Sequence, residues 1–236
     1  MDRDWTLRTA RPDDAEGIVA VARTTWPPTY AALLTTTTIE RFLSIAYETD
    51  RVRRRIAAAD RLDLAVSAGG SIVGFAEWLV PARSIGLVSP SAGLDAAPSA
   101  GRDRGGGVDS CAGGPATSRW PGSSAGRPSP APPLDAIAGS RAGPRAEEAE
   151  LAATYILPGW QRRGIGRSFH ERAVAAYAGR VRAFVLSVAR ENLPALAFYR
   201  SLGYVDSAAY VEELFGERTA ELRMRLMLDA PDQGPG

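Results

Sequence analysis

Hydrophobic positions in the first part of the chain follow two periods, one typical of strands and one typical of helices. Residues 4–10, DWTLRTA, alternate polar and apolar side chains and predict a strand. Residues 11–14, Arg-Pro-Asp-Asp, can open a helix that runs through Val21. Residues 38–47 carry apolar side chains on one helical face, and a cationic helix is predicted over 51–59. One strand and three helices are therefore expected first.

A β-hairpin is predicted next. Two apolar segments, LDLAVSA at 62–68 and SIVGFAEWLV at 71–80, flank Gly69-Gly70. A two-glycine connection between such segments is a common hairpin turn, because glycine readily adopts the positive φ angles that the turn requires.

The C-terminal part again alternates strand and helix patterns. Strands are predicted at 149–157, 183–189 and 220–228, and helices at 165–178 and 193–203, the last ending at a glycine. The apolar face of the first of these helices holds Ile165, Phe169, Ala173 and Tyr177. The full order, with two strands at the end, predicts an α/β fold with a mixed central sheet and helices packed on it.

Residues 83–148 have a different composition. They hold 12 of the chain's 24 glycines and 9 of its 17 prolines, but one aromatic residue, Trp120. Such a segment cannot bury enough apolar surface to offset the entropy of ordering it. It is predicted to be a disordered insertion. The remaining 170 of the 236 residues suffice for one core, so a single domain spanning 1–236 is expected.

Composition narrows the function classes. Lys and Arg number 28 against 27 Asp and Glu, so the chain lacks the excess of positive charge that is typical of nucleic-acid-binding proteins. The Arg51–Arg55 run is interpreted as a solvated helix face. The single Cys111 excludes an intrachain disulfide framework, and the single His170, expected on an exposed face, excludes a His-rich metal site. No metal is expected. The charged N-terminus and the absence of a long apolar run predict a cytoplasmic protein without membrane contact.

The turn between the strand at 149–157 and the helix at 165–178 combines glycines with cationic side chains. Its sequence over 158–167 is PGWQRRGIGR. The N–H groups at a helix N-terminus are unpaired donors, and together with the helix dipole they favour a phosphate group. Glycine lets the backbone approach an anion closely. The turn lacks the Gly-Lys-Ser/Thr of a nucleoside triphosphate loop and the third glycine of a dinucleotide loop. An ordinary glycine turn with solvated arginines is the alternative.

Two segments resemble the GNAT N-acetyltransferase superfamily. Residues 161–166, QRRGIG, are similar to its Gln/Arg-x-x-Gly-x-Gly/Ala signature. Residues 192–204, NLPALAFYRSLGY, resemble its Asn-x-x-Ala-x-x-Phe-Tyr-x-x-x-Gly-Phe segment. Residues 24–34, TTWPPTYAALL, resemble the helix-loop-helix that closes over the acceptor. The resemblance implies the GNAT fold, with about six to seven strands and a splayed parallel pair.

The resemblance also implies a binding site for acetyl-CoA, the acetyl donor. Free N–H groups near Ile156 and Leu157 are expected to bind the pantetheine arm and to polarise the thioester carbonyl. Asn192 is expected to help hold this arm, with a helix N-cap as the alternative role. The pyrophosphate would lie against the turn, on Gln161, Arg162, Arg163, Gly164, Ile165, Gly166 and Arg167.

Tyr199 is the implied general acid, placed to protonate the departing thiolate; helix packing is its alternative role. Glu150 is the candidate base, with Glu77 as a rival, and either could act through water. The alternative for both is a solvated carboxylate at a strand end. The acceptor pocket is expected to be lined by aromatic residues and one carboxylate, namely Trp26, Tyr30, Trp78 and Glu77. Core packing is the commoner role of such aromatics.

The expected function is therefore transfer of an acetyl group from acetyl-CoA to a primary amine by direct attack in a ternary complex. The acceptor would be a small-molecule or peptide amine, and a homodimer is possible. A noncatalytic acyl-CoA-binding regulatory module of the same fold is the alternative function.

Overall fold

The computed structural model describes residues 3–80 and 147–228. The predicted disorder of the insertion, and Cys111 within it, lie outside the described residues. The predicted order of elements is confirmed: β1 (Trp5–Thr9), α1 (Ala15–Tyr30), α2 (Thr36–Ala46), α3 (Thr49–Ala58), β2 (Arg61–Ser67), β3 (Ile72–Leu79), β4 (Glu148–Ile156), α4 (Ile165–Tyr177), β5 (Ala183–Ala189), α5 (Leu193–Ser201), β6 (Val205–Leu214) and β7 (Glu217–Met227).

Two boundaries differ from the prediction. α1 continues beyond Val21 to Tyr30 and includes Pro27 and Pro28. Its buried side continues through Trp26, so tertiary packing supports a helix where the prolines favour a break. β4 begins at Glu148, the residue at which the insertion was predicted to end.

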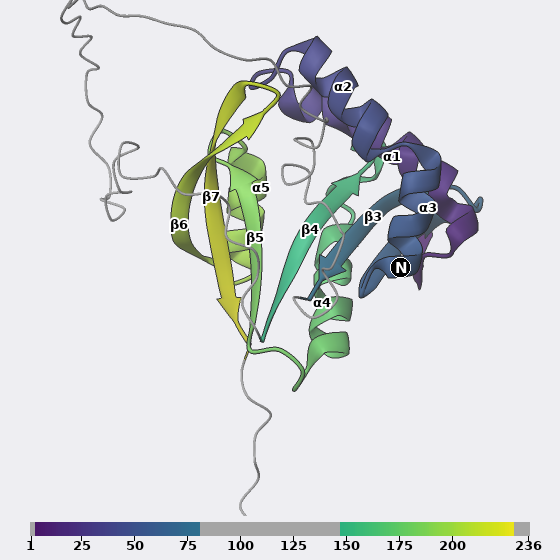
Figure 1. The fold of residues 1–236 in the computed structure, drawn as a ribbon. Helices are drawn as coiled ribbons and strands as arrows, with labels where there is room; N and C mark the ends of the chain where they lie inside the picture. Colours follow the sequence, from purple (N-terminus) through teal and green to yellow (C-terminus); the bar gives the residue numbers. More distant parts are fainter. Residues whose placement is uncertain (1–2, 81–146, 229–236) are drawn as a thin grey trace, which may run out of the picture.

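The strands form one mixed sheet in the order β1-β2-β3-β4-β5-β7-β6. β4 and β5 are its parallel neighbours (Figure 1). In the described sheet their pairing runs only from Glu148 opposite Ala183 to Leu151 opposite Leu186. β4 then continues to Ile156 and β5 to Ala189, and the two strands diverge into the V seen in Figure 1. The splayed parallel pair is thus present.

A β-bulge lies where this divergence begins. Trp78 of β3 faces Leu151, and its neighbour Glu77 faces Ala153, so Ala152 is an extra residue in β4. An extra residue reverses the in-and-out alternation of a strand. Leu151 accordingly belongs to one core of the protein, whereas Ala153 packs against the other.

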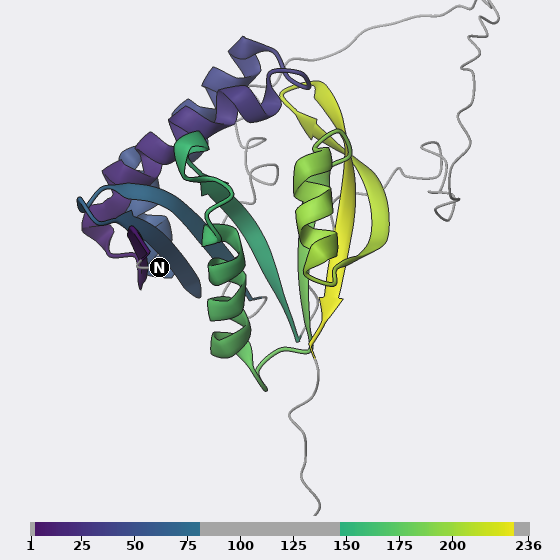
Figure 2. The same ribbon diagram turned by 180° about the vertical axis from the view of Figure 1, so that it is seen from behind.

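Helices cover both faces of the sheet. α4 and α5 lie on one face (Figure 2), over a core that includes the predicted stripe of Ile165, Phe169, Ala173 and Tyr177. α1, α2 and α3 lie on the opposite face over a second core, which contains Trp26, Phe42 and Phe75. The predicted apolar stripe of α4 is confirmed, because all four of its residues are buried.

The open end of the V is bridged by the β6–β7 hairpin, whose tip meets the N-terminus of α2 (Figure 1). The Glu217 carboxylate accepts hydrogen bonds from Thr35 N (2.8 Å), Thr35 Oγ1 (2.5 Å) and Thr38 Oγ1 (2.5 Å). A carboxylate at a helix N-terminus is favoured by the helix dipole. The guanidinium of Arg41 lies 4.1 Å from the ring centroid of Phe215 in the same hairpin. These contacts hold α2 against the far half of the sheet.

A buried carboxylate connects β2 to α4 and provides a test of the fold. Asp63 is fully buried and pairs with Arg61 Nε (2.5 Å) and Arg172 Nε (3.0 Å). Asp63→Ala leaves two guanidinium groups without their carboxylate, so we expect a loss of about 3 kcal/mol in unfolding free energy, at the lower end for a broken buried pair because Arg172 is partly exposed. Asp206→Ala, which removes an exposed partner of Arg200, should cost less than about 1 kcal/mol. Urea unfolding of both variants checks this, and equal midpoints would contradict it.

Candidate active site

The turn before α4 presents backbone N–H groups without helix partners. Gly164 is the N-cap, with φ +83°, and it contributes no side-chain cap. The helical ladder begins with Ser168 N donating to Gly164 O at 3.0 Å. The N–H groups of residues 165–167 therefore have no carbonyl in the preceding turn. Residues 161–164 are exposed, so an anion can reach this end of the helix.

Contacts within the turn fix its shape. Gln161 Nε2 donates to Ile156 O at 3.0 Å, which ties the turn to the end of β4. Arg163 pairs with Asp4 at 2.6 Å and lies 4.9 Å from the Trp160 ring centroid. Of the predicted cofactor ligands, Gln161 thus stabilises the turn. Arg162, Arg163 and Arg167 are all exposed, and Arg163 is paired with Asp4.

The two glycines of the turn serve different ends. Gly164 requires its positive φ, and a Cβ there would meet no atom within 4 Å. A Cβ on Gly166 would lie 3.1 Å from Cζ of Phe198. Gly166 was predicted to admit phosphate oxygens, but the side of this residue that a Cβ would occupy faces α5. Its missing side chain leaves room for the Phe198 ring of α5.

The hydrogen bonds along β4 show that one of the predicted cofactor ligands is wrong. Leu157 N donates to Val73 O at 2.9 Å, so the expected free N–H at Leu157 is wrong. Because hydrogen bonds alternate in direction along an antiparallel strand, the N–H groups of Ile156 and Thr154 point to the opposite edge, towards β5. Both lie beyond the last β4–β5 pair. Ile156 therefore remains a candidate donor, and Thr154 is a donor that the sequence did not reveal.

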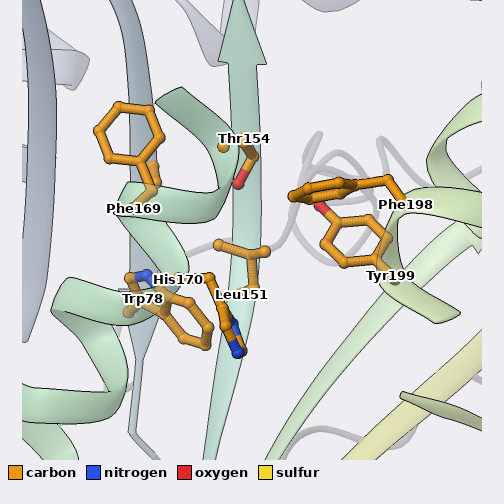
Figure 3. A pocket seen from close by; sticks show the side chains of 9 residues that line it. Trp78, Leu151, Thr154, Phe169, His170, Phe198 and Tyr199 are labelled. Atoms are coloured by element: carbon orange, nitrogen blue, oxygen red, sulfur yellow. The ribbon is translucent and has the colours of Figure 1, made fainter. Parts of the chain in front are cut away.

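A small pocket lies between α4 and α5, beside the point where β4 leaves β5 (Figure 3). Side chains of β3, β4, α4 and α5 line it: Ala76, Trp78, Leu151, Thr154, Gly166, Phe169, His170, Phe198 and Tyr199. The sequence predicts Tyr199 as a site residue, and the structure brings it together with Gly166 and Trp78 here. Burial raises the pKa of Tyr199 to about 12, and the nearby Thr154 hydroxyl opposes part of this rise. Tyr199 is therefore a neutral phenol at pH 7 that can donate a proton.

His170 was predicted to be exposed, and this is wrong. It is half-buried, lines the pocket and lies edge-on to Phe184, with ring centroids 5.8 Å apart. Burial lowers its pKa, so the imidazole is neutral at pH 7. The apolar stripe of α4 is wider than its four main positions indicate, because Phe184 of β5 and Tyr204 contact the side of α4 that holds His170.

The two candidate bases lie on the other face of the sheet. Glu77 is buried and forms an ion pair with Arg55 Nε at 3.0 Å. Burial raises the pKa of Glu77, and Arg55 opposes this shift. Glu150 is 3% exposed and lies between two residues of the core beneath α4, so strand alternation directs its side chain to the α1–α3 face. Neither is the solvated strand-end carboxylate of the alternative interpretation.

The predicted acceptor aromatics are divided between the two faces. Trp26 and Tyr30 gather on the α1–α3 face, with ring centroids 4.3 Å apart, and the hydroxyls of Tyr30 and Tyr155 are 3.4 Å apart. Burial raises the pKa of Tyr30 to about 12. Trp78 lies on the α4–α5 face, with its ring centroid 4.5 Å from that of Phe184. The structure therefore separates Trp78 from the other acceptor candidates and places it in the Tyr199 pocket.

Asn192 acts as the N-cap of α5. Its Oδ1 accepts a hydrogen bond from Ala195 N at 3.2 Å, which satisfies one donor of the helix start. The capping role that the sequence left open is thus confirmed. If Asn192 also helps to hold the acetyl donor, it would have to do so through its side-chain amide NH₂.

Two other kinds of site are absent from residues 3–80 and 147–228. These residues hold no group of three or more His, Cys, Asp or Glu side chains arranged to hold a metal ion. No helix among them has the length and apolar character that crossing a bilayer requires.

Residues 130–204 match the sequence model of the acetyltransferase (GNAT) family, and this range contains both the turn before α4 and the segment around Tyr199. Over this range the chain is similar to the GNAT family. No curated protein matches the sequence. Two solved structures with the GNAT fold cover nearly the whole chain. PaiA N-acetyltransferase from Thermoplasma acidophilum, solved with coenzyme A, has a TM-score of 0.59 at 16% identity and covers 96% of this chain and 100% of its own. A GCN5-related N-acetyltransferase from Rhodopseudomonas palustris has a TM-score of 0.57 at 15% identity, covering 97% and 98%.

Proposed function

We propose that this protein transfers an acetyl group from acetyl-CoA to a primary amine, by direct attack of the amine in a ternary complex. The observation that carries the proposal is the opening between β4 and β5 beyond Leu151, with an anion-binding turn at its rim and Tyr199 beside it. The coenzyme A complex of the PaiA relative supports the choice of donor.

The chain's groups fit such a donor. The N–H groups of residues 165–167 would hold the pyrophosphate, helped by the exposed cations Arg162 and Arg167. The N–H groups of Ile156 and Thr154 face the opening and would bind the pantetheine arm and the thioester carbonyl. When bound, acetyl-CoA supplies an activated acetyl group.

Tyr199 would supply the proton that the departing thiolate needs. Its phenol is neutral at pH 7 because burial raises its pKa to about 12. A neutral phenol beside the sulfur can donate its proton as the carbon–sulfur bond breaks.

The acceptor would approach from the α1–α3 face, where Trp26 and Tyr30 lie with Tyr155. An alkyl amine is mostly protonated at pH 7 and must lose a proton before it attacks. We assign this proton to Glu150, directly or through water, because Glu150 lies on β4, the strand that borders the opening, whereas Glu77 lies on β3. The acceptor is a small-molecule or peptide amine.

A thiol-release assay with purified protein, acetyl-CoA and a panel of amines tests the function. We expect release that depends on both the protein and one class of amine, and that saturates with acetyl-CoA. Acetyl-CoA binding measured by calorimetry, without amine-dependent release across small amines and peptides, would favour the noncatalytic acyl-CoA-binding module instead.

A further inference from the structure

The side chain of Thr154 faces Tyr199 because of the bulge at Ala152. Strict alternation from Leu151 would place residue 154 on the α1–α3 face. The extra residue instead turns Thr154 into the pocket between α4 and α5, where its hydroxyl points towards the Phe198–Tyr199 side (Figure 3). Bulges next to active sites commonly redirect a side chain in this way.

The Thr154 hydroxyl is buried, and among the described residues Oγ1 has no hydrogen bond of good geometry, although it lies close enough to the Tyr199 hydroxyl to lower the pKa of that phenol. A buried polar atom without a well-formed hydrogen bond costs stability, and a role in an active site is one reason for retaining it. Catalytic hydrogen bonds are often long in the free enzyme and shorten when the substrate binds. The Tyr199 hydroxyl in the same pocket is the partner that Thr154 can reach.

Four titratable groups that lie near Tyr199 in the described part of the chain are neutral at pH 7. These groups are His170 on α4, Tyr204 after the end of α5, Tyr155 on β4 and Tyr30 on α1. Burial lowers the pKa of His170 and raises the pKa of each of these tyrosines. A phenolate formed at Tyr199 therefore depends on neutral hydrogen-bond donors.

We propose that Thr154 is a positioning residue whose hydroxyl orients the Tyr199 hydroxyl and then donates a hydrogen bond to the Tyr199 phenolate. The inference rests on the proposed function and assigns a step within it. As the carbon–sulfur bond breaks, its electron pair stays on sulfur and the Tyr199 proton moves to that sulfur. Tyr199 is left as a phenolate, which accepts the Thr154 O–H until water returns a proton to it.

Two variants isolate the hydroxyl. Thr154→Val replaces it with a methyl group of similar size, and Thr154→Ser keeps it. With 3-fluorotyrosine incorporated, the ¹⁹F resonance of Tyr199 can be assigned by its loss in Tyr199→Phe and titrated in the free protein. Ring fluorination lowers a phenol's pKa into an accessible range. We expect the pKa of residue 199 to rise by roughly one to two units in Thr154→Val, because the phenolate loses a hydrogen bond. Thr154→Ser should stay near wild type.

Turnover provides the second readout. In Thr154→Val, kcat should fall roughly ten- to a hundredfold, the scale of one hydrogen bond to a charged group, with little change in KM for acetyl-CoA. Thr154→Ser should recover most of this loss. In a Tyr199→Phe background, Thr154→Val should add little, because the two groups act through one interaction.

The two readouts separate failure of this inference from failure of the proposed function. An unchanged pKa of Tyr199 in Thr154→Val, or an equal loss of kcat in the valine and serine variants, overturns the role of Thr154. A shifted pKa in a protein that transfers no acetyl group supports the Thr154–Tyr199 interaction and counts against the function alone.

Discussion

Tyr199→Phe should lower kcat about a hundredfold or more, the usual scale for loss of a positioned proton donor. The substitution removes one oxygen and keeps the ring that packs against Phe198 and Tyr204. Affinity for acetyl-CoA, measured by calorimetry, should change little, because the proposed pyrophosphate and pantetheine contacts lie on the turn before α4 and on β4. The loss should therefore reside in kcat, as for an interaction made in the transition state.

Tyr204→Phe is the matched control. This neighbouring tyrosine is almost fully buried, and its ring centroid lies 5.6 Å from that of Tyr199. Tyr204 is not among the residues that line the pocket, so removal of its hydroxyl should leave turnover near the wild-type value. An acetyl thioester with a more acidic thiol should restore much of the rate of Tyr199→Phe. Full activity of Tyr199→Phe with acetyl-CoA would make Tyr199 a packing residue and leave water as the acid.

Gly164→Asp should lower the affinity for acetyl-CoA roughly ten- to a hundredfold more than Gly164→Asn does. Both side chains fit, since a Cβ at Gly164 meets no atom within 4 Å, and both pay a similar cost for the positive φ. Both can also cap α4. Aspartate alone places a negative charge beside the proposed pyrophosphate site, where repulsion at about 4 Å amounts to roughly 1 kcal/mol per charge pair in water and more near a protein surface.

Calorimetry at two salt concentrations shows whether the difference in acetyl-CoA affinity between Gly164→Asp and Gly164→Asn comes from the charge of the side chain or from its shape. Screening weakens interactions between exposed charges, so the difference between the aspartate and asparagine variants should shrink as salt rises. Equal affinities of the two variants at low salt would place the pyrophosphate elsewhere.

The sequence predicts the parts of the site that local geometry determines. Gly164 and the helix that begins at Ile165 form a contiguous turn, and their role follows from the backbone alone. The apolar stripe of α4 repeats at helical spacing, so the spacing of its four residues is enough to predict that they are buried. Tyr199 belongs to a short helix with a recognisable cap and end, but its selection as the acid comes from the resemblance of residues 192–204 to the GNAT segment.

The parts that the sequence misses depend on pairing between distant strands. Nothing in the residues around Ala152 signals a bulge, because the extra residue is defined by its partner strand, β3. That bulge decides which side chains of β4 face Tyr199 and so conceals Thr154. The bond from Leu157 N to Val73 O likewise depends on the β3–β4 register, and the placement of Trp78 depends on which face of β3 α4 covers.

The central claim is that acetyl-CoA lies in the opening between β4 and β5, with its pyrophosphate at the N-terminus of α4. Hydrogen–deuterium exchange with and without acetyl-CoA tests this directly, because an amide that gains a hydrogen bond exchanges more slowly. We expect added protection at residues 165–167 and at Thr154 and Ile156. The amide of Leu157, which already donates to Val73, should change less. Saturation with acetyl-CoA that leaves exchange at residues 154–167 unchanged would contradict the account.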